Sequence, residues 1–241
     1  MQLFYFIVTF EVAEGKEQEF RREFDEIAND LQQASGGRGV SATLYEVSSE
    51  VEEHLLQVPG ISSALQGRPN SRASFRFVII AEWESVAHYE ASIRARQQNK
   101  RISFPANPGY YRVAAEYLGA NNTISQPEQG FTFINPFEIP EGEEAEFIKQ
   151  WHMTIQHLNT ASGFVSARLY EVDLEVEAQL LKVPGLAEVL QRRPNGKARF
   201  PFIWVSEWAS VAQYADAVRA FGRGKPISFT SHPAFYLPVT K

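Results

Sequence analysis

The feature that most constrains the fold of this chain is an internal repeat. Three stretches of its first half recur in the same order in its second half: FEVAEGKEQEF at 10–20 as FEIPEGEEAEF at 137–147, VSATLYEV at 40–47 as VSARLYEV at 165–172, and EWESVAHY at 82–89 as EWASVAQY at 207–214. Solenoid repeats are only about 20–50 residues long, so this repeat indicates duplication of a whole domain. The intervening LGANNTISQPEQG is rich in Asn, Gly, Ser and Pro, as linkers are. We therefore predict a first domain at 1–117, a linker at 118–130 and a second domain at 131–241.

Both halves show the same succession of strand and helix patterns. Apolar residues alternate over 4–10 and over 131–137, as in a strand, and recur at helical spacing from Phe20 and from Phe147. The patterns that follow predict, in the two halves, a strand (40–47, 164–172), an insertion with two short helices (50–68, 175–193), a strand (75–83, 200–208), a helix (85–98, 210–222) and a final strand (109–117, 234–239). This order is the split βαβ plan of ferredoxin-like domains.

The predicted strands are apolar on both faces. In 200–208, Trp204 lies on one face and Ile203 on the other. An antiparallel sheet covered by helices on one side normally has a polar second face. We therefore predict an α+β protein in which two ferredoxin-like βαββαβ domains pack sheet against sheet, as homodimers do with two chains, to form an intrachain dimeric α/β barrel. The insertions are expected to be helical flaps near the pocket mouths, and further association into a homo-oligomer is left open.

The composition argues against several classes of partner. The net charge is −6 and no run of Lys or Arg occurs, which disfavours binding to nucleic acid or to an anionic membrane. The chain has no Cys, which excludes disulfides and thiolate metal sites. The apolar start, MQLFYFIVTF, lacks the basic flank and cleavage site of a signal peptide, and no apolar run approaches the ~20 residues of a membrane span. We expect a cytoplasmic protein.

Four stretches of the second half resemble a known family: INPFEIPEGEEAEFIKQW at 134–151, GFVSARLYEV at 163–172, RFPFIWVSEWASVAQY at 199–214 and SHPAFY at 231–236. On these residues the second half resembles the antibiotic biosynthesis monooxygenase superfamily of dimeric α/β barrel proteins. The first half shares EGKEQEF, LYEV and EWESVAHY but lacks the Asn-Pro and His-Pro dipeptides. Both halves depart from the usual short member of the family by their insertions.

This superfamily is functionally mixed, and a shared fold does not fix the chemistry. In its anthrone oxygenases, a Trp at the end of the third strand and a Tyr six residues later line the pocket; Trp208 and Tyr214 have that spacing, as do their counterparts in the first half. Its haem-degrading members combine a first-strand Asn, which Asn135 matches, with an axial His ten residues after the Trp. Val218 occupies that position here, so a haem site of the family type is not expected.

The halves differ in polar residues on positions expected to be core, and the second half has gained them. A purely structural copy has no reason to do so, because burial of polar groups is costly. We therefore place the working site in the second half and predict that the first-half cavity is filled or inert. The predicted catalytic residues are Asn135, His152 and Arg168, and the predicted substrate-binding residues are Trp151, Tyr170, Trp204, Trp208 and Tyr214.

These candidates also have ordinary structural interpretations. An unpaired buried amide costs a few kcal/mol, so Asn135 needs a hydrogen-bond partner, either a ligand or the backbone. Alternatively, Pro136 makes Asn135 part of a β-bulge. Arg168 is expected either to hold an anion or to form a cross-sheet ion pair. His152 is either a pocket base, a role for which histidine is the usual side chain, or a surface residue. The aromatic candidates fit an ordinary apolar core as well as a pocket.

The resemblance implies a cofactor-independent monooxygenase-like enzyme that acts on a polycyclic aromatic or quinol-type substrate, in secondary metabolism. The expected partner is a small aromatic molecule. The resemblance implies no cofactor. No metal is expected, because His152 and His157 are five residues apart and do not share a helical face. Two alternatives stay open: a non-catalytic aromatic-ligand-binding or cyclase-like protein, and a haem-binding or haem-degrading enzyme with His152 as an unusual ligand.

Overall fold

The chain folds into two compact units, each assembled from three separate segments. In a computed structural model, the described residues are 3–34, 40–59, 61–66, 68, 72–95, 102–119, 130–183, 186–191, 193, 196–221 and 227–239. Unit 1 comprises Met1–Tyr45, Phe75–Arg112 and Val172–Arg199, and unit 2 comprises Glu46–Ser74, Val113–Glu171 and Phe200–Lys241. The predicted linker falls outside the described residues except for 118, 119 and 130.

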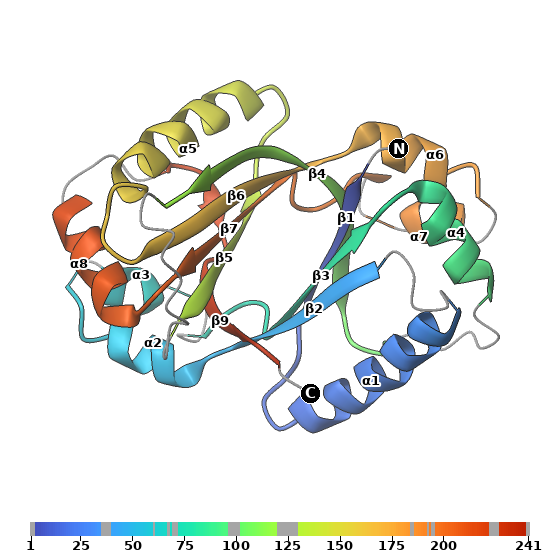
Figure 1. Ribbon diagram of the computed structural model, residues 1–241, viewed down its shortest axis with the longest axis horizontal. Coiled ribbons are helices and arrows are strands. Elements are labelled where there is room, and N and C mark those ends of the chain that lie inside the picture. The colour runs from blue at the N-terminus through green and yellow to red at the C-terminus, as the bar shows by residue number, and fades with distance from the viewer. Residues whose placement is uncertain are drawn as a thin grey trace. The chain divides into compact units, whose positions relative to one another are not determined.

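Both units mix helices and strands (Figure 1), which confirms the predicted α+β class. The elements of the first half are β1 (Phe4–Phe10), α1 (Glu17–Ala34), β2 (Val40–Val47), α2 (Ser49–Leu55), α3 (Ile61–Gln66), β3 (Phe77–Trp83), α4 (Val86–Ala95) and β4 (Ala106–Leu118). Those of the second half are β5 (Phe131–Glu138), α5 (Glu144–Leu158), β6 (Phe164–Val172), α6 (Leu174–Leu180), α7 (Leu186–Gln191), β7 (Phe202–Trp208), α8 (Val211–Phe221), β8 (Thr230–Ser231) and β9 (Ala234–Pro238). The order of elements therefore agrees with the order predicted from the two patterns of periodicity.

The strands of the two units are arranged in the same order. In unit 1 the order is β4–β1–β3–β2, with β1 antiparallel to both of its neighbours. In unit 2 the order is β9–β5–β7–β6, with β5 antiparallel to β7 and β9. In each half, therefore, the first strand lies between the third and the fourth, and the second strand pairs with the third.

The insertions are exchanged between the halves. Helices α2 and α3 come from the first half but belong to unit 2, whereas α6 and α7 come from the second half but belong to unit 1. Each pair contributes to a hydrophobic core, with Leu55 of α2 fully buried in unit 2 and Leu180 of α6 fully buried in unit 1. The expectation of flaps is thus corrected: the apolar stripe of each short helix is part of a core, because burial of leucine side chains is favourable.

The local sequence explains where these exchanged helices begin. Ser48 precedes α2 and its Oγ accepts a hydrogen bond from the backbone N–H of Val51. Asp173 occupies the equivalent position before α6, and its Oδ1 accepts from the N–H groups of Glu175 and Val176. Ser and Asp are favoured at N-caps because their side chains satisfy N–H groups that lack an intrahelical partner.

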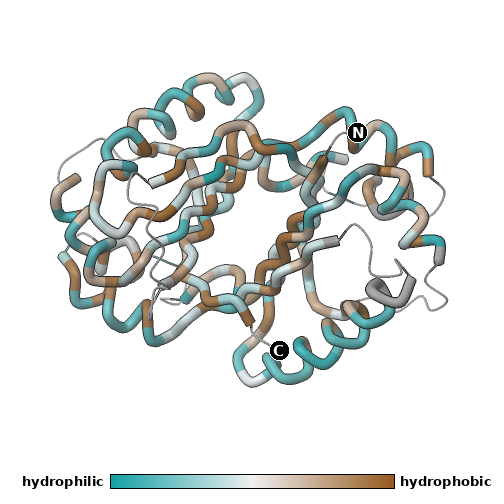
Figure 2. The backbone as a smooth tube through the Cα atoms, in the orientation of Figure 1, coloured by the Kyte–Doolittle hydropathy of each residue, from teal (hydrophilic) through white to brown (hydrophobic). Residues whose placement is uncertain are grey.

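The two long helices are buried to different extents. Within the described side chains of α1, only Phe20 is buried, and the helix is mostly hydrophilic in Figure 2. In contrast, α5 buries Phe147, Trp151, Thr154, Ile155 and Leu158. The equivalent of Trp151 in α1 is Phe24, which is only half-buried. The helix that covers the sheet in unit 2 is therefore the more tightly packed of the two.

Because α2 and α3 of the first half belong to unit 2, a mutation in α2 should destabilise unit 2. Leu55→Ala should lower the free energy of unfolding by about 2–5 kcal/mol, the usual cost of such a cavity. Hydrogen-exchange protection should decrease in β5 and β7, which belong to unit 2 as Leu55 does, and not in β1 of unit 1. The matched control is Leu56→Ala, since Leu56 is 40% exposed and should cost only about 0.5 kcal/mol. Loss of protection confined to β1 and β3 would contradict the unit assignment.

Candidate functional site

The candidate site lies on the face of the unit 2 sheet that α5 covers. Asn135 of β5 pairs with Trp204 of β7, and Trp204 pairs with Leu169 of β6. Directly paired residues of antiparallel strands point to the same side of a sheet. The Trp151 ring of α5 meets the Trp204 ring edge to face, with the centroids 6.3 Å apart. Asn135 and Trp204 therefore point toward α5.

Aromatic rings line this face on both sides of Asn135. Phe133 lies edge to face against Trp204, with the centroids 5.1 Å apart. Trp208 and Tyr214 are in edge-to-face contact at 4.9 Å, and Tyr214 also contacts Phe133 at 6.2 Å. The structure thus brings together Trp151, Trp204, Trp208 and Tyr214, four of the five residues predicted to bind substrate, in one hydrophobic core.

Three buried polar groups in this core have no hydrogen-bond partner within the described part of the chain. They are Asn135 Oδ1, Trp151 Nε1 and Trp204 Nε1, on residues that are 6%, 0% and 7% exposed. Leaving such a group unpaired typically costs about 1–3 kcal/mol. In contrast, Trp208 Nε1 donates to Ser206 Oγ at 3.2 Å. One acceptor and two donors are therefore available to a molecule that enters this core.

The positions of unit 1 that correspond to Asn135 and Trp204 are apolar, although the described part of unit 1 has an unpaired buried indole N–H of its own at Trp83. Val8 takes the place of Asn135, and Ile79 takes the place of Trp204. The two are paired neighbours in β1 and β3, as Asn135 and Trp204 are in β5 and β7. The gain of polar groups in the second half thus falls on a real core position, as the sequence comparison predicted for Asn135.

Pro136 shapes the strand beside Asn135. The register between β5 and β7 is continuous over Phe131–Phe137, so no bulge lies on that side. On its other edge, β5 pairs with β9 and then with β8, and the last strand is interrupted between them. Proline has no N–H for the ladder, which accounts for the break. The Pro136 carbonyl still accepts a hydrogen bond from the His232 N–H, at 3.0 Å.

His152 faces a tyrosine that sequence reasoning missed. Its Nδ1 lies 3.0 Å from the Tyr117 hydroxyl, and the Tyr117 ring also contacts Trp151, with the centroids 5.8 Å apart. Tyr117 comes from the end of β4, beyond the part of the first half that is matched in the second half. No repeat could therefore have pointed to it. His152 and Tyr117 form a polar pair at the edge of the aromatic core.

The structure does not bring Arg168 and Tyr170 to this site. Arg168 pairs with Val205 and Tyr170 with Ile203, one residue out of phase with Trp204, so both lie on the opposite face of the sheet from Asn135. The Arg168 side chain is 44% exposed and forms an ion pair with Glu116 at 2.7 Å. Partial burial lowers the pKa of the guanidinium, but hydrogen bonds to Glu116 and Tyr170 outweigh this and raise it. The alternative of a cross-strand ion pair is thus the one that the geometry supports.

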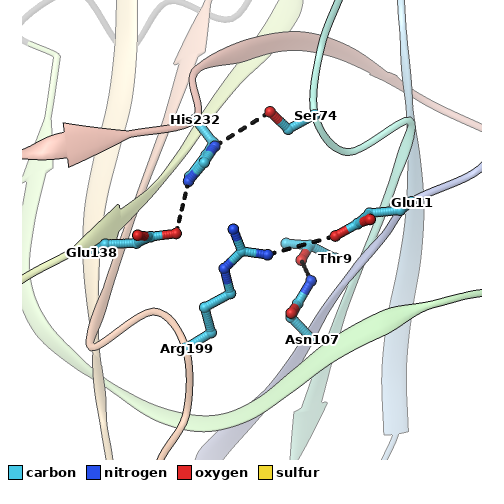
Figure 3. Close-up of polar contacts among 7 residues, drawn as sticks. All are labelled: Thr9, Glu11, Ser74, Asn107, Glu138, Arg199 and His232. Atoms are coloured by element: carbon cyan, nitrogen blue, oxygen red, sulfur yellow. Dashed lines mark hydrogen bonds and ion pairs between the residues drawn. The ribbon is translucent and has the colours of Figure 1, made fainter. Parts of the chain in front are cut away.

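His232 is held on both sides of its ring (Figure 3). Ser74 Oγ lies 3.2 Å from Nδ1, and Glu138 Oε1 lies 3.1 Å from Nε2. The equivalent positions in unit 1 contain a different contact, an ion pair between Arg199 and Glu11 at 3.5 Å. His232 therefore links the end of β5 to the segment before β3. Among the described residues, no group of three His, Asp or Glu side chains could hold a metal ion.

Comparison with solved structures identifies the fold. The chain is similar to a "putative monooxygenase" of Fusobacterium nucleatum, with a TM-score of 0.52 and 10% identity over 99% of this chain and 93% of that one. It is also similar to an anthrone oxidase-like protein, with a TM-score of 0.57 and 12% identity over 99% of this chain and 91% of that one. No protein-family model matches the chain, and a search of curated proteins finds no match. At these identities the likeness shows the fold alone, the mixed α+β fold of monooxygenase-like proteins.

The unpaired amide oxygen predicts an unusual response to mutation. Asn135→Leu removes a buried acceptor that has no partner among the described residues and keeps the branched shape of the side chain, so it should raise the free energy of unfolding by about 1–3 kcal/mol. The matched variant in unit 1, Val8→Asn, should lower it, because it buries an amide among apolar side chains. Urea unfolding of the three proteins measures both changes. A large loss of stability in Asn135→Leu would contradict the absence of a partner for Oδ1.

Four buried tyrosines predict a loss of stability at alkaline pH. Burial raises the pKa of the hydroxyls of Tyr110, Tyr111, Tyr214 and Tyr236. The folded state therefore favours the neutral form, and this contribution is complete below the ordinary tyrosine pKa of about 10 and is lost as the pH rises above it. The free energy of unfolding should fall above that pH, and less steeply in Tyr236→Phe. An identical slope in the variant would argue against a raised pKa for Tyr236.

Proposed function

We propose that the protein is a cofactor-independent monooxygenase-like enzyme that oxidises a hydroxylated aromatic compound in the core of unit 2. The observation that carries this proposal is the set of unpaired groups at Asn135, Trp151 and Trp204. A phenolic hydroxyl complements all of them, because its O–H donates to Asn135 Oδ1 while its oxygen accepts from the indole N–H groups. Stacking and edge contacts with the surrounding aromatic rings suit the body of such a substrate.

We further propose that the two halves are duplicated ferredoxin-like domains of an intrachain dimeric α/β barrel. The identical order of strands in the two units supports this. So does the burial of β5 residues on both faces of the sheet, since Ile134 and Asn135 are both buried. The structural similarity to the anthrone oxidase-like protein is consistent with it.

The proposed chemistry requires a base, a stabilised anion and O₂. In an anthrone-type substrate, the base removes the proton that converts the substrate to its enolate. We assign this role to His152, whose ring contacts Trp151 with the centroids 5.3 Å apart and whose Nδ1 is held by Tyr117. The indole N–H groups of Trp151 and Trp204 stabilise the negative charge on the oxygen.

The electrons for the oxidation come from the bound substrate itself. The enolate passes one electron to O₂, and the resulting radical pair combines to form a C–O bond. The peroxide formed in this way takes up a proton and loses water, which leaves a new carbonyl group on the substrate. One oxygen atom of O₂ thus enters the product and the other leaves as water, so that no external reductant is consumed.

A binding protein without catalysis is the second candidate, and the burial of the site favours it. Asn135, Trp151 and Trp204 are almost inaccessible to solvent, as expected for a core that retains its ligand. Such a protein would bind a hydroxyarene without consuming O₂. Haem binding has no comparable support, because Val218 packs against the apolar core at the position of the family's axial ligand.

Oxygen consumption tests the proposal directly. With anthrone as substrate, after treatment with a chelator, the protein should consume O₂ and form anthraquinone and water. Asn135→Ala and His152→Ala should each lower kcat by about 100-fold, the scale for loss of a positioned hydrogen bond or a general base. Val8→Ala, the matched variant in unit 1, should retain the wild-type rate.

Three outcomes would count against this assignment. Tight binding of anthrone without O₂ consumption would favour the binding protein. Loss of turnover in Val8→Ala but not in Asn135→Ala would move the site to unit 1. A loss in Arg168→Gln as large as in Asn135→Ala would contradict the placement of these two residues on opposite faces of the sheet.

A further inference from the structure

Unit 1 contains a buried arginine, Arg193, in which two guanidinium nitrogens have no hydrogen-bond partner among the described residues. Arg193 follows α7, and its side chain is only 6% exposed. Its Nη1 donates to Glu177 Oε1 at 2.5 Å, whereas Nε and Nη2 have no partner within the described ranges. Burial of guanidinium N–H groups without hydrogen bonds is costly. Two donors of this side chain are therefore available to a ligand.

The equivalent arginine of unit 2 has one of these donors occupied. Arg68 Nη1 donates to Glu52 at 2.8 Å, and Arg68 Nη2 donates to the Pro233 carbonyl at 2.6 Å. Only Nε of Arg68 is without a partner among the residues that the structure describes. Arg193 thus has two nitrogens without a partner, whereas Arg68 at the equivalent position has one.

The two free donors of Arg193 lie on the same edge of the guanidinium. The N–H groups of Nε and Nη2 are parallel, and this fork matches the two oxygens of a carboxylate. A lone carbonyl or hydroxyl would satisfy only one of them. Because Glu177 occupies the far side of the group, a carboxylate at the free edge would complete the hydrogen bonding of Arg193.

The guanidinium group of Arg193 lies over an aromatic ring. The Arg193 Cζ atom is 5.7 Å from the centroid of the Tyr110 ring. Tyr110 in turn contacts Phe6 at 5.1 Å, and its hydroxyl lies 2.9 Å from that of Tyr89. Phe6 is only partly buried against this cluster. The surroundings therefore suit an aromatic ring attached to the anionic group.

We propose that unit 1 holds a second ligand site, in which the Nε and Nη2 edge of Arg193 binds the carboxylate of a small aromatic acid. The site combines an arginine of the second half with Tyr110 and Phe6 of the first half, so the exchange of α6 and α7 creates it. It lies in a different unit from Asn135 and goes beyond the proposed oxygenation. Its ligand is an acid and not a neutral hydroxyarene.

Titration calorimetry with 2-naphthoate and its uncharged analogue 2-naphthalenemethanol tests this site in the full chain. The wild type should bind 2-naphthoate saturably and the alcohol at least roughly tenfold more weakly, because charge-assisted hydrogen bonds contribute about 1.5 kcal/mol or more. Arg193→Lys keeps the charge but loses the fork, and should weaken the binding of 2-naphthoate by a similar factor. Arg68→Lys, the matched control in unit 2, and Asn135→Ala should bind it like the wild type.

The comparison of acid with alcohol in the wild type needs no variant, so it stands even if Arg193→Lys fails to fold. The proposal is overturned if the wild type does not bind 2-naphthoate saturably or binds the alcohol as tightly. It is also overturned if Arg68→Lys weakens binding as much as Arg193→Lys does. Loss of binding in Asn135→Ala would place the acid in the oxygenase site of unit 2 and would equally reject a separate site.

Discussion

The structure depends on the burial of four short helices in cores that their own half of the chain does not form. Leu55 of α2 is buried with Trp151 and Phe133, and Leu180 of α6 is buried with Phe4 and Trp83. The helix-covered face of each sheet is apolar, and its coverage is completed by helices from the other half. Because the gain from apolar burial is the main favourable term in folding, neither half supplies a complete core by itself.

This exchange of insertions also explains how the two units can bury different polar groups. Each unit combines most of the strands of one half with the insertion of the other, so substitutions in either half alter both units. Asn135 and Trp204 place unpaired polar groups in unit 2 where the paired residues Val8 and Ile79 are apolar in unit 1. Arg193 gives unit 1 a buried charged group with two nitrogens that have no partner within the described ranges. The favourable burial of many aromatic side chains offsets the unfavourable burial of these polar groups.

His152, the proposed base, is also positioned by a contact with a distant part of the chain. His152 lies next to Trp151 in α5, but the hydroxyl near its Nδ1 belongs to Tyr117 in β4. The hydrogen bond fixes the orientation of the imidazole relative to the aromatic core, and the orientation of a base matters as much as its pKa. The end of β4 therefore lies at the candidate site together with α5.

The sequence alone determined the order of helices and strands, because hydrophobic periodicity is a local signal. It also singled out Asn135, since a polar residue among alternating phenylalanines is visible without a structure. Pairing across strands was decided only in three dimensions. Alternation shows that Arg168 and Tyr170 share a face, but only the register with β7 shows that this face is not that of Asn135. The local sequence likewise does not show in which unit each insertion packs. An apolar helical stripe can pack against any apolar sheet face within reach of the chain.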